Sequence, residues 1–280
     1  MSEAKLPQKI LVTGANGMLG KDLCPALEAE GFEVIKTDID NLDITDLTQV
    51  EEFFANNTPD FIVHCAAYTN VDGAEENPEL AEKINVLGSK NIALQAKKYD
   101  IPILAVSTDY VFDGRGLRPY EPTDKPDPQS VYGATKLGGE LAVKEQTKKY
   151  FIARTSWLYG IHGKNFVETM IALAQKMPEL KVVDDQIGCP TWTMELANGI
   201  IKIIREQKPY GIYHICGSGF TSWYGFAKKI FELARMYVNL KPCTTEEFPR
   251  PAKRPAYSVM DNNNICRHWE EALEDYMKLR

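Results

Sequence analysis

The chain has 280 residues, of which 44% are hydrophobic and 25% are charged, close to the average of globular proteins. This composition excludes a disordered, collagen-like or disulfide-dense chain, and the length suits one large domain or one domain with an added lobe. With 32 Lys and Arg against 39 Asp and Glu, the net charge is −7, which argues against a nucleic-acid or anionic-membrane partner.

The amino-terminal segment 1–9 is polar and therefore predicts no secretory signal. No apolar run approaches the ~18 residues that a membrane helix needs. The six cysteines form no C-x-x-C pair, and the four histidines lie far apart in the sequence. We therefore expect a cytoplasmic protein with reduced thiols, no metal site and no membrane association.

The first half of the chain alternates between strand and helix patterns. Short apolar runs predict strands at 9–13, 33–37, 61–65, 102–107 and 151–155. The segments between them predict helices at 18–30, 46–56, 80–98 and 131–149, with a Pro-rich loop at 109–129. This alternation predicts an α/β fold with a Rossmann-type, doubly wound parallel sheet that helices cover on both faces.

The second half has a looser pattern. It predicts helices at 166–176, 194–206 and 223–238, strands at 181–183 and 212–215, and a Pro-rich connection at 242–255. We expect residues 1–156 to form a dinucleotide-binding domain, to which later strands can contribute. Residues 157–280 are expected to form a smaller substrate-binding lobe.

A glycine-rich turn, Gly14-Ala-Asn-Gly17-Met-Leu-Gly20, joins the first strand to the first helix. Glycine lets the backbone approach a pyrophosphate, and the free N–H groups of the helix start stabilise its charge. The alternative is a tight turn without a ligand. The strand, the helix and a downstream acidic residue together favour a dinucleotide.

That acidic residue is Asp38, which closes the second strand near the ~20-residue offset of a ribose-binding carboxylate. A carboxylate there accepts hydrogen bonds from the ribose 2′-OH and repels a 2′-phosphate, which favours NADH. Lys21 and Lys36 are nearby cations that could still admit NADPH, so the choice of coenzyme stays open. Asp43-Ile44, on the next loop, could border the adenine.

The third strand ends in Cys65-Ala-Ala-Tyr68. Small residues at the carboxyl end of a strand let a cofactor pass across it, in the crevice where open α/β sheets bind ligands. Ordinary packing of a helix on the strand accounts for these residues equally well.

The fourth strand ends in Ser107-Thr108-Asp109, whose side chains point into the same crevice. A hydroxyl group there can donate to a substrate carbonyl and orient it, although these residue types also form turns. The physical argument does not separate Ser107 from Thr108.

Tyr132 and Lys136 lie four residues apart at the start of the next helix, so they share one face with Cβ atoms ~5–6 Å apart. A neighbouring ammonium group lowers the pKa of a phenol from its usual ~10. Tyr132 could then deliver a proton to a developing alkoxide. Such pairs are common by chance, but the position after a dinucleotide fingerprint favours a catalytic pair.

Together these motifs resemble the extended short-chain dehydrogenases/reductases and, more narrowly, the dTDP-4-dehydrorhamnose reductase family. The resemblance runs from about residue 9 to about residue 261. Besides the three motifs above, it rests on the segments 66–72, 107–112, 154–157, 165–166, 184–191 and the Arg-Pro segment before Ser258.

The resemblance implies a catalytic triad of Thr108, Tyr132 and Lys136, and it selects Thr108 over Ser107. The coenzyme contacts are expected at Gly14, Asn16, Gly17, Met18, Leu19, Asp38, Asp43, Ile44, Ala66, Ala67, Tyr68, Tyr132 and Lys136. The sugar contacts are expected at Thr108, Asp109 and Trp157. Tyr68 stands where family members often carry His, a change that keeps an aromatic ring.

The implied reaction is NADPH- or NADH-dependent reduction of the 4-keto group of dTDP-4-dehydro-β-L-rhamnose to dTDP-L-rhamnose. The substrate diphosphate needs cations, and the densest basic stretch of the second half is Arg250-Pro-Ala-Lys-Arg254. We expect Arg254, with Arg250 as a second candidate, to face the diphosphate. The alternative for this stretch is a solvated charged loop.

Two other functions remain open at this stage. A regulatory subunit resembling methionine adenosyltransferase β would keep the dinucleotide site and act through a protein partner. A sugar-nucleotide epimerase or dehydratase would use the same scaffold, although Asp109-Tyr110 after Thr108 is not the Asp-Glu pair of a dehydratase. The expected partner is a small nucleotide sugar, and a homodimer is one option for the assembly.

Overall fold

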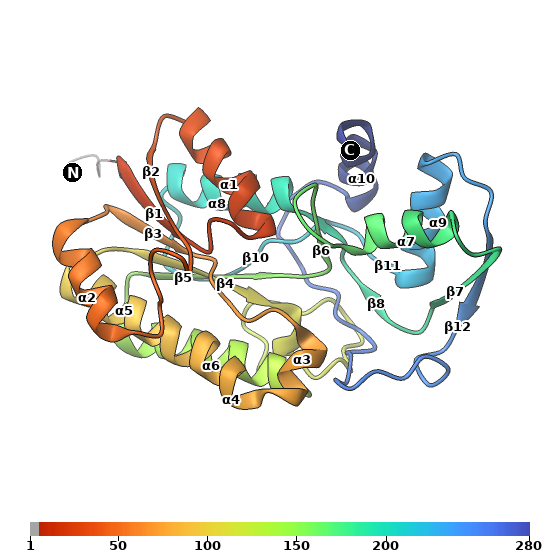
Figure 1. The fold of residues 1–280 in the computed structure, drawn as a ribbon, viewed down its shortest axis with the longest axis horizontal. Coiled ribbons are helices and arrows are strands. Elements are labelled where there is room, and N and C mark those ends of the chain that lie inside the picture. The colour runs from red at the N-terminus through yellow and green to blue at the C-terminus, as the bar shows by residue number, and fades with distance from the viewer. Residues whose placement is uncertain (1–5) are drawn as a thin grey trace.

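A six-stranded parallel sheet forms the centre of the fold in the computed structural model, which describes residues 6–280 (Figure 1). The strand order is β10-β5-β4-β3-β1-β2, and every neighbouring pair is parallel. The strands are β1 (Lys9–Thr13), β2 (Glu33–Thr37), β3 (Phe61–His64), β4 (Ile103–Thr108), β5 (Tyr150–Thr155) and β10 (Gly211–His214). This confirms the predicted doubly wound α/β fold. The sequence analysis expected no secretory signal in the segment 1–9, and residues 1–5 of that segment lie outside the described residues.

Helices cover both faces of the sheet (Figure 1). One face carries α1 (Met18–Ala29) and α8 (Thr193–Arg205), and the other carries α2 (Leu47–Asn56), α5 (Ser89–Lys98) and α6 (Val131–Gln146). Successive residues of β1 serve both layers: Ile10 and Val12 join the core under α1 and α8, and Leu11 joins the opposite core. Each fully buried aliphatic side chain contributes ~1.5–3 kcal/mol, so the sheet is a rigid support for the loops at its ends.

The order of the strands places a crevice between β1 and β3. The chain leaves β1 for β2 on one side of the sheet and then crosses to β3, β4, β5 and β10 on the other. The loops after β1 and β3 therefore diverge at their carboxyl ends, where open α/β sheets bind their ligands.

The segment 71–98 differs from the single helix predicted at 80–98. It forms α3 (Val71–Glu76), α4 (Pro78–Glu82), a π-helical turn η1 (Lys83–Gly88) and then α5. Asn70 caps α3 by accepting a hydrogen bond from the Gly73 amide at 3.0 Å, and Pro78 restarts the helix because its ring suits the first turn. Short π-helical turns often occur at functional sites, and this one carries the buried Asn85.

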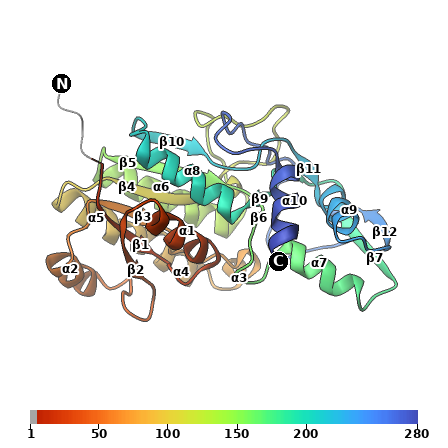
Figure 2. The ribbon, with the colours of Figure 1, turned by 90° about the horizontal axis from the view of Figure 1, so that it is seen from above.

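The second part of the molecule lies beside the sheet, and the two parts follow each other along the longest axis of the molecule (Figures 1 and 2). Its elements are β6 (Leu158–Tyr159), α7 (Phe166–Ala174), β7 (Glu179–Val183), β8 (Ile187–Gly188), β9 (Thr191–Trp192), β11 (Thr221–Ser222), α9 (Trp223–Leu233), β12 (Asn239–Cys243) and α10 (Trp269–Leu279). A second core of aromatic residues, with Tyr159, Phe226 and Tyr276 fully buried, holds them together. Two elements beyond residue 157, α8 and β10, return to the central sheet.

The sequence analysis predicted neither the short strands β6, β8, β9 and β11 nor β12 and α10. The connection at 242–255 begins inside β12, which pairs with β7 in parallel. The chain ends in α10, which lies between the central sheet and helices α7 and α9 in both views (Figures 1 and 2). The helix predicted at 223–238 ends at Leu233, before the left-handed backbone of Arg235 at φ +55°.

Within residues 6–280, no helix is both long and apolar enough to cross a membrane, and no cluster of His, Cys, Asp and Glu is suited to a metal ion. The six cysteines are unpaired, and all except the partly buried Cys65 are buried.

Candidate active site

The glycine-rich turn after β1 leaves no room for larger side chains. Gly14 has a left-handed backbone at φ +69°, and a Cβ atom there would lie 2.7 Å from the Ala66 amide nitrogen. A Cβ atom at Gly20 would lie 2.5 Å from the Gly14 carbonyl oxygen. Helix α1 begins after Gly17 without a side-chain cap, so its first N–H groups are available to an anion. This cradle fits the pyrophosphate of a dinucleotide.

Asp38 is hydrogen-bonded to the glycine-rich turn. Its Oδ2 accepts the Asn16 amide at 2.9 Å, and its Oδ1 accepts the Ile39 amide at 2.8 Å. The predicted neighbour Lys36 forms an ion pair with Glu28 at 2.7 Å, whereas Lys21 is exposed. The carboxylate therefore stands at the tip of β2 with its position fixed by backbone amides.

The loop after β2 carries the two residues expected near an adenine. Asp43 accepts the amide and hydroxyl of Thr45 at 2.9 and 2.7 Å, and these hydrogen bonds hold the pKa of its carboxyl below the usual range. Ile44 is buried, and its carbonyl accepts from Asn91 at 2.9 Å.

The loop after β3 is positioned by a residue that the sequence analysis missed. Asn85 of η1 accepts the Tyr68 amide at 2.8 Å and donates to the Tyr68 carbonyl at 3.2 Å. It also donates to the Thr135 hydroxyl of α6 at 3.0 Å. Ala66, Ala67 and Tyr68 are thus held beside α6, all three partly buried. An Asn in the middle of a predicted helix, where it is a weak helix former, was the available signal.

At the end of β4, the structure distinguishes the hydroxyl groups of Ser107 and Thr108, which the physical argument from the sequence could not. Ser107 donates to Glu140 Oε1 at 2.5 Å, away from the crevice. Thr108 points the other way, and its hydroxyl lies beside the phenol of Tyr132. The alternation of the strand therefore assigns the site position to Thr108.

Tyr132 and Lys136 lie on the first two turns of α6, which Ser130 caps by accepting the Gly133 amide at 3.2 Å. Burial raises the pKa of Tyr132 to about 12, against a smaller opposing effect of the Thr108 hydrogen bond. Burial lowers the pKa of Lys136 to about 8, and its Nζ donates to the Val106 carbonyl at 2.7 Å. The predicted lowering of the Tyr132 pKa is therefore wrong for this arrangement, because burial dominates and the ammonium group faces a backbone oxygen.

A buried ion pair lies one turn beyond Lys136, and the sequence analysis did not find it. Arg154 of β5 donates to Glu140 from Nε at 2.9 Å and from Nη2 at 2.7 Å. The two side chains are 1% and 3% exposed, and the guanidinium lies 5.0 Å from the centre of the Phe112 ring. This pair fixes α6 against β4 and β5, and with it the positions of Tyr132 and Lys136.

Trp157 enters the site from the loop after β5 with a left-handed backbone at φ +46°. Its indole stacks on Trp223 with ring centres 3.6 Å apart and planes 5° apart. A Cβ atom at Gly188 would lie 2.5 Å from the same indole. Such backbone strain in a bulky residue costs ~1–3 kcal/mol and persists where the surrounding structure enforces it. Trp223 was not among the predicted residues.

The two basic candidates at the end of the Pro-rich connection differ. Arg254 donates to both carboxylate oxygens of Asp72, from Nη2 at 2.8 Å and from Nη1 at closer range, and the side chains are 18% and 27% exposed. The pair lowers the pKa of Asp72. Arg250 is exposed and lies 4.7 Å from the centre of the Phe248 ring. Arg254 thus joins α3 to the Pro-rich connection, while Arg250 is a solvated side chain.

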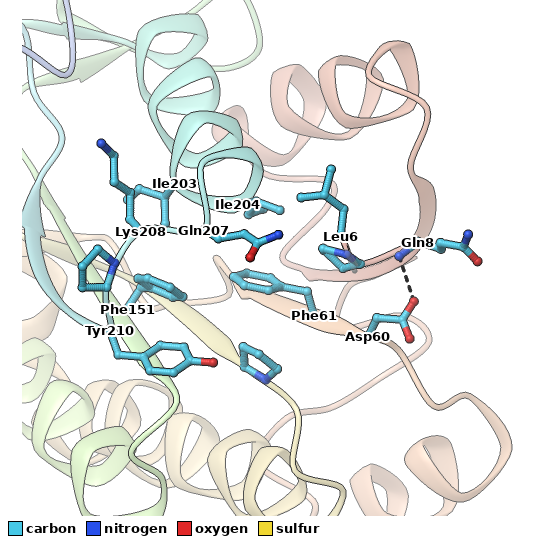
Figure 3. A pocket seen from close by; sticks show the side chains of 13 residues that line it. Leu6, Gln8, Asp60, Phe61, Phe151, Ile203, Ile204, Gln207, Lys208 and Tyr210 are labelled. Atoms are coloured by element: carbon cyan, nitrogen blue, oxygen red, sulfur yellow. Dashed lines mark hydrogen bonds between the residues drawn. The ribbon is translucent and has the colours of Figure 1, made fainter. Parts of the chain in front are cut away.

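A cavity of about 560 Å³ lies at the opposite edge of the sheet (Figure 3). Phe61, Phe151 and Tyr210 line it together with residues next to the amino ends of β1 and β4. The glycine-rich turn, Thr108 and Tyr132 lie at the carboxyl ends. The cavity is therefore separate from the candidate site.

Nearly the whole chain is similar to known proteins, in sequence and in structure. The family model described as RmlD substrate binding domain matches residues 8–279. The spore coat polysaccharide biosynthesis protein SpsK of Bacillus subtilis is 43% identical over 278 residues, covering 97% of this chain and 98% of that protein. A crystal structure of a dTDP-4-dehydrorhamnose reductase from Clostridium acetobutylicum is 49% identical with a TM-score of 0.94, over 97% of this chain and 99% of that one. The dTDP-4-dehydrorhamnose reductase of Bacillus anthracis, solved in complex with NADP, is 43% identical with a TM-score of 0.94, over 98% and 99%. The similarity extends over the sheet and the second part alike.

Proposed function

Because the chain belongs to the RmlD substrate binding domain family, we propose that it reduces the 4-keto group of dTDP-4-dehydro-β-L-rhamnose to give dTDP-L-rhamnose. It is an NAD(P)H-dependent oxidoreductase of dTDP-rhamnose biosynthesis. The observation that carries the proposal is the meeting of Thr108, Tyr132 and Lys136 beside the glycine-rich turn, at one edge of the sheet.

When bound, the reduced nicotinamide supplies the hydride for C4 of the sugar. The cradle at Gly14 and Gly17 and the amides of Met18 and Leu19 hold the coenzyme phosphates in this proposal. The remaining coenzyme contacts are those expected from the sequence, from Asp38 at the tip of β2 to Tyr68 after β3.

Thr108 holds the C4 oxygen, and Tyr132 donates the proton that the developing alkoxide takes up. The pKa of Tyr132, about 12, keeps the phenol protonated and therefore ready to donate near neutral pH. Lys136 contacts the nicotinamide ribose. Its buried ammonium group, with a pKa of about 8, then lies near the phenolate that the reaction leaves.

Asp109, Trp157 and Arg254 form the substrate side of the proposal. Trp157 offers its indole to the apolar face of the sugar, with Trp223 stacked on the ring. Arg254 faces the diphosphate while Asp72 holds its guanidinium in place. In this division, residues 1–156 with α8 and β10 bind the coenzyme, and the remainder of 157–280 binds the nucleotide sugar.

A cytoplasmic location belongs to the same proposal, because all six thiols are free. The regulatory-subunit alternative predicts coenzyme binding without turnover. An epimerase would retain its coenzyme and recycle it within one turnover, so it would consume no NADH or NADPH in bulk.

The test follows the absorbance of NADH or NADPH with enzymatically prepared dTDP-4-dehydrorhamnose. We expect oxidation of at least one coenzyme in proportion to the sugar reduced. Folded protein that binds coenzyme but consumes neither would refute the reductase function and favour the regulatory alternative.

Tyr132→Phe is the first variant to measure. Loss of the donated proton should lower kcat by about 10²- to 10⁴-fold, while the Kd for coenzyme stays within a few-fold. Tyr213→Phe is the matched control, because its hydroxyl donates to the Pro209 carbonyl near the amino end of β10, away from the candidate site. Equal activity of both variants would exclude Tyr132 as the proton donor.

A further inference from the structure

The hydroxyl of Thr108 has a single hydrogen, and in this structure Asp109 Oδ1 is the acceptor nearest to it. Its Oγ1 accepts the Tyr110 amide at 3.2 Å and lies 3.0 Å from Asp109 Oδ1. An ionised carboxylate can only accept hydrogen bonds. If Asp109 were ionised, the hydrogen of Thr108 would be committed to Oδ1 and could not be donated to a substrate oxygen.

The surroundings of Asp109 offer its negative charge little support. The residue is 1% exposed, and its Oδ2 is buried without a hydrogen-bond partner in the described chain. The buried Ser258 hydroxyl lies next to it, and this hydroxyl, the Thr108 hydroxyl and the backbone of Asp109 and Tyr110 act to lower the pKa of Asp109, but burial is the larger effect and raises it. No cation is among the groups that act on this carboxyl in the described chain, so burial costs its charged form more than these neutral contacts return.

The titratable groups packed against Asp109 come from three elements. They are the phenol of Tyr110 on the same turn, the phenol of Tyr132 on α6, and the thiol of Cys216 after β10. Burial is the largest or second-largest cause that raises the pKa of each of them, so all three are neutral near pH 7. None of these neighbours supplies a positive charge to Asp109.

We propose that Asp109 works as a neutral carboxylic acid that donates its hydrogen to Thr108 Oγ1. Thr108 then accepts from Asp109 and from the Tyr110 amide, and its own hydrogen is free for the C4 oxygen of the sugar. Asp109 is in this respect a positioning residue that acts through Thr108. The inference rests on the proposed reductase function, and it adds the protonation state that makes the Thr108 contact possible.

The sign of the pH dependence follows from this arrangement. Burial raises the pKa of Asp109 to about 6, and the acid form is the productive one. The turnover number should therefore fall as pH rises through the pKa of Asp109 in the enzyme–substrate complex.

Asp109→Asn tests this, because an amide can donate to Thr108 as the acid does but cannot ionise. We expect the kcat ratio of Asp109→Asn to wild type to be flat at low pH. Above the pKa of Asp109 the ratio should rise about tenfold per pH unit. Taking the ratio cancels the titration of Tyr132 and Lys136. A ratio that stays flat between about pH 5 and about pH 9 would overturn the proposal.

The Thr108→Val background separates this role from a structural one. Without the hydroxyl, the residual activity should no longer depend on the state of Asp109, so adding Asp109→Asn should give a flat ratio. A ratio that still rises with pH in this background would show that Asp109 acts elsewhere. Unchanged thermal unfolding and coenzyme Kd of Asp109→Asn control for folding.

A spectroscopic readout does not depend on turnover. The infrared difference between wild type and Asp109→Asn should contain a carboxylic-acid C=O band at about pH 5 that disappears at higher pH. A carboxylate band throughout this range would overturn the proposal. If the protein fails to turn over the sugar nucleotide but shows the acid band, the proposed function fails and the protonation state of Asp109 stands.

Discussion

Asp38 is the residue whose charge bears most directly on the choice of coenzyme. Its carboxylate lies where a ribose 2′ substituent is expected, and two backbone amides hold it there. The NADP complex of the Bacillus anthracis relative makes the effect of this charge a practical question, because a 2′-phosphate would have to lie near it.

We expect Asp38→Asn to shift selectivity toward NADPH. Removing one charge from a partly exposed site changes a like-charge contact by ~1 kcal/mol, so the ratio of kcat/KM for NADPH over NADH should rise about fivefold. The measurement is steady-state kinetics with both coenzymes at fixed sugar nucleotide. Asp40→Asn, at an exposed carboxylate two residues on, is the control, and an equal shift in both variants would exclude a local role for Asp38.

Trp157 depends on its neighbour Trp223 for its orientation. The strained backbone at φ +46° and the stacked indoles together hold the Trp157 ring in one orientation. In the proposed function, sugar recognition therefore also depends on Trp223, which need not contact the sugar itself.

Replacing Trp223 with Leu should raise KM for the nucleotide sugar about tenfold, since losing an aromatic pair costs ~0.5–1.5 kcal/mol beyond its area. The KM for coenzyme should not change. Tyr237→Leu, at a fully exposed side chain, provides the comparison. If kcat fell while KM for the sugar held, the indole pair would have another role.

At the scale of elements, α6 carries the proposed catalytic residues Tyr132 and Lys136 and is fixed by the Glu140–Arg154 pair. Breaking a buried pair by removing one partner costs ~3–5 kcal/mol, because the other charge stays buried and unpaired. Surface pairs such as Arg118–Asp124 contribute at most ~1 kcal/mol.

We therefore expect Glu140→Gln to lower the free energy of unfolding by ~3–5 kcal/mol and Arg118→Ala by less than ~1 kcal/mol. Denaturant unfolding followed by circular dichroism measures both. The double change Glu140→Leu with Arg154→Met should recover much of the loss, since it leaves no unpaired charge. A Glu140→Gln protein as stable as wild type would show that the pair adds little.

The sequence predicts elements well where one local pattern decides them. The five strands of the first half follow from apolar runs bounded by turns, and Asp46 caps α2 as expected by accepting the Gln49 amide at 3.2 Å. The break within 71–98 was not predicted, because a π-helical turn adds one residue without changing the composition. β12 was missed because Pro242 interrupts its apolar pattern, and only pairing with β7 makes it a strand.

The same distinction holds for the site. Gly14, Thr108, Tyr132 and Lys136 belong to short motifs whose spacing has a physical meaning, so they could be predicted as site residues from the sequence. Asn85, Glu140 and Trp223 act through partners 14 to 66 positions away in the chain. No local pattern records such pairs, and only the folded chain brings them together.

At the scale of the whole molecule, two anionic ligands are bound by a protein with a net charge of −7. Backbone amides at the start of α1 provide one phosphate site without side-chain charge. In the proposed function Arg254 provides the cation for the other, and its ion pair with Asp72 leaves little net charge at that position. Local geometry, and not the overall charge, therefore governs which anions the protein takes up.

The unpaired thiols allow local opening of the molecule to be measured by alkylation. Burial raises the pKa of Cys24 to about 11 and of Cys65 and Cys266 to about 12, so the reactive thiolate is scarce near neutral pH. The buried Cys24 and Cys266 therefore react with an alkylating reagent only when their surroundings open, whereas the partly buried Cys65 reacts slowly without opening. The alkylation rate of each buried thiol then reports how often one region opens. Cys24 reports on α1, and Cys266 reports on the segment that precedes α10. Cys65, which directly follows β3 at the crevice, should be alkylated more slowly when coenzyme occupies that crevice.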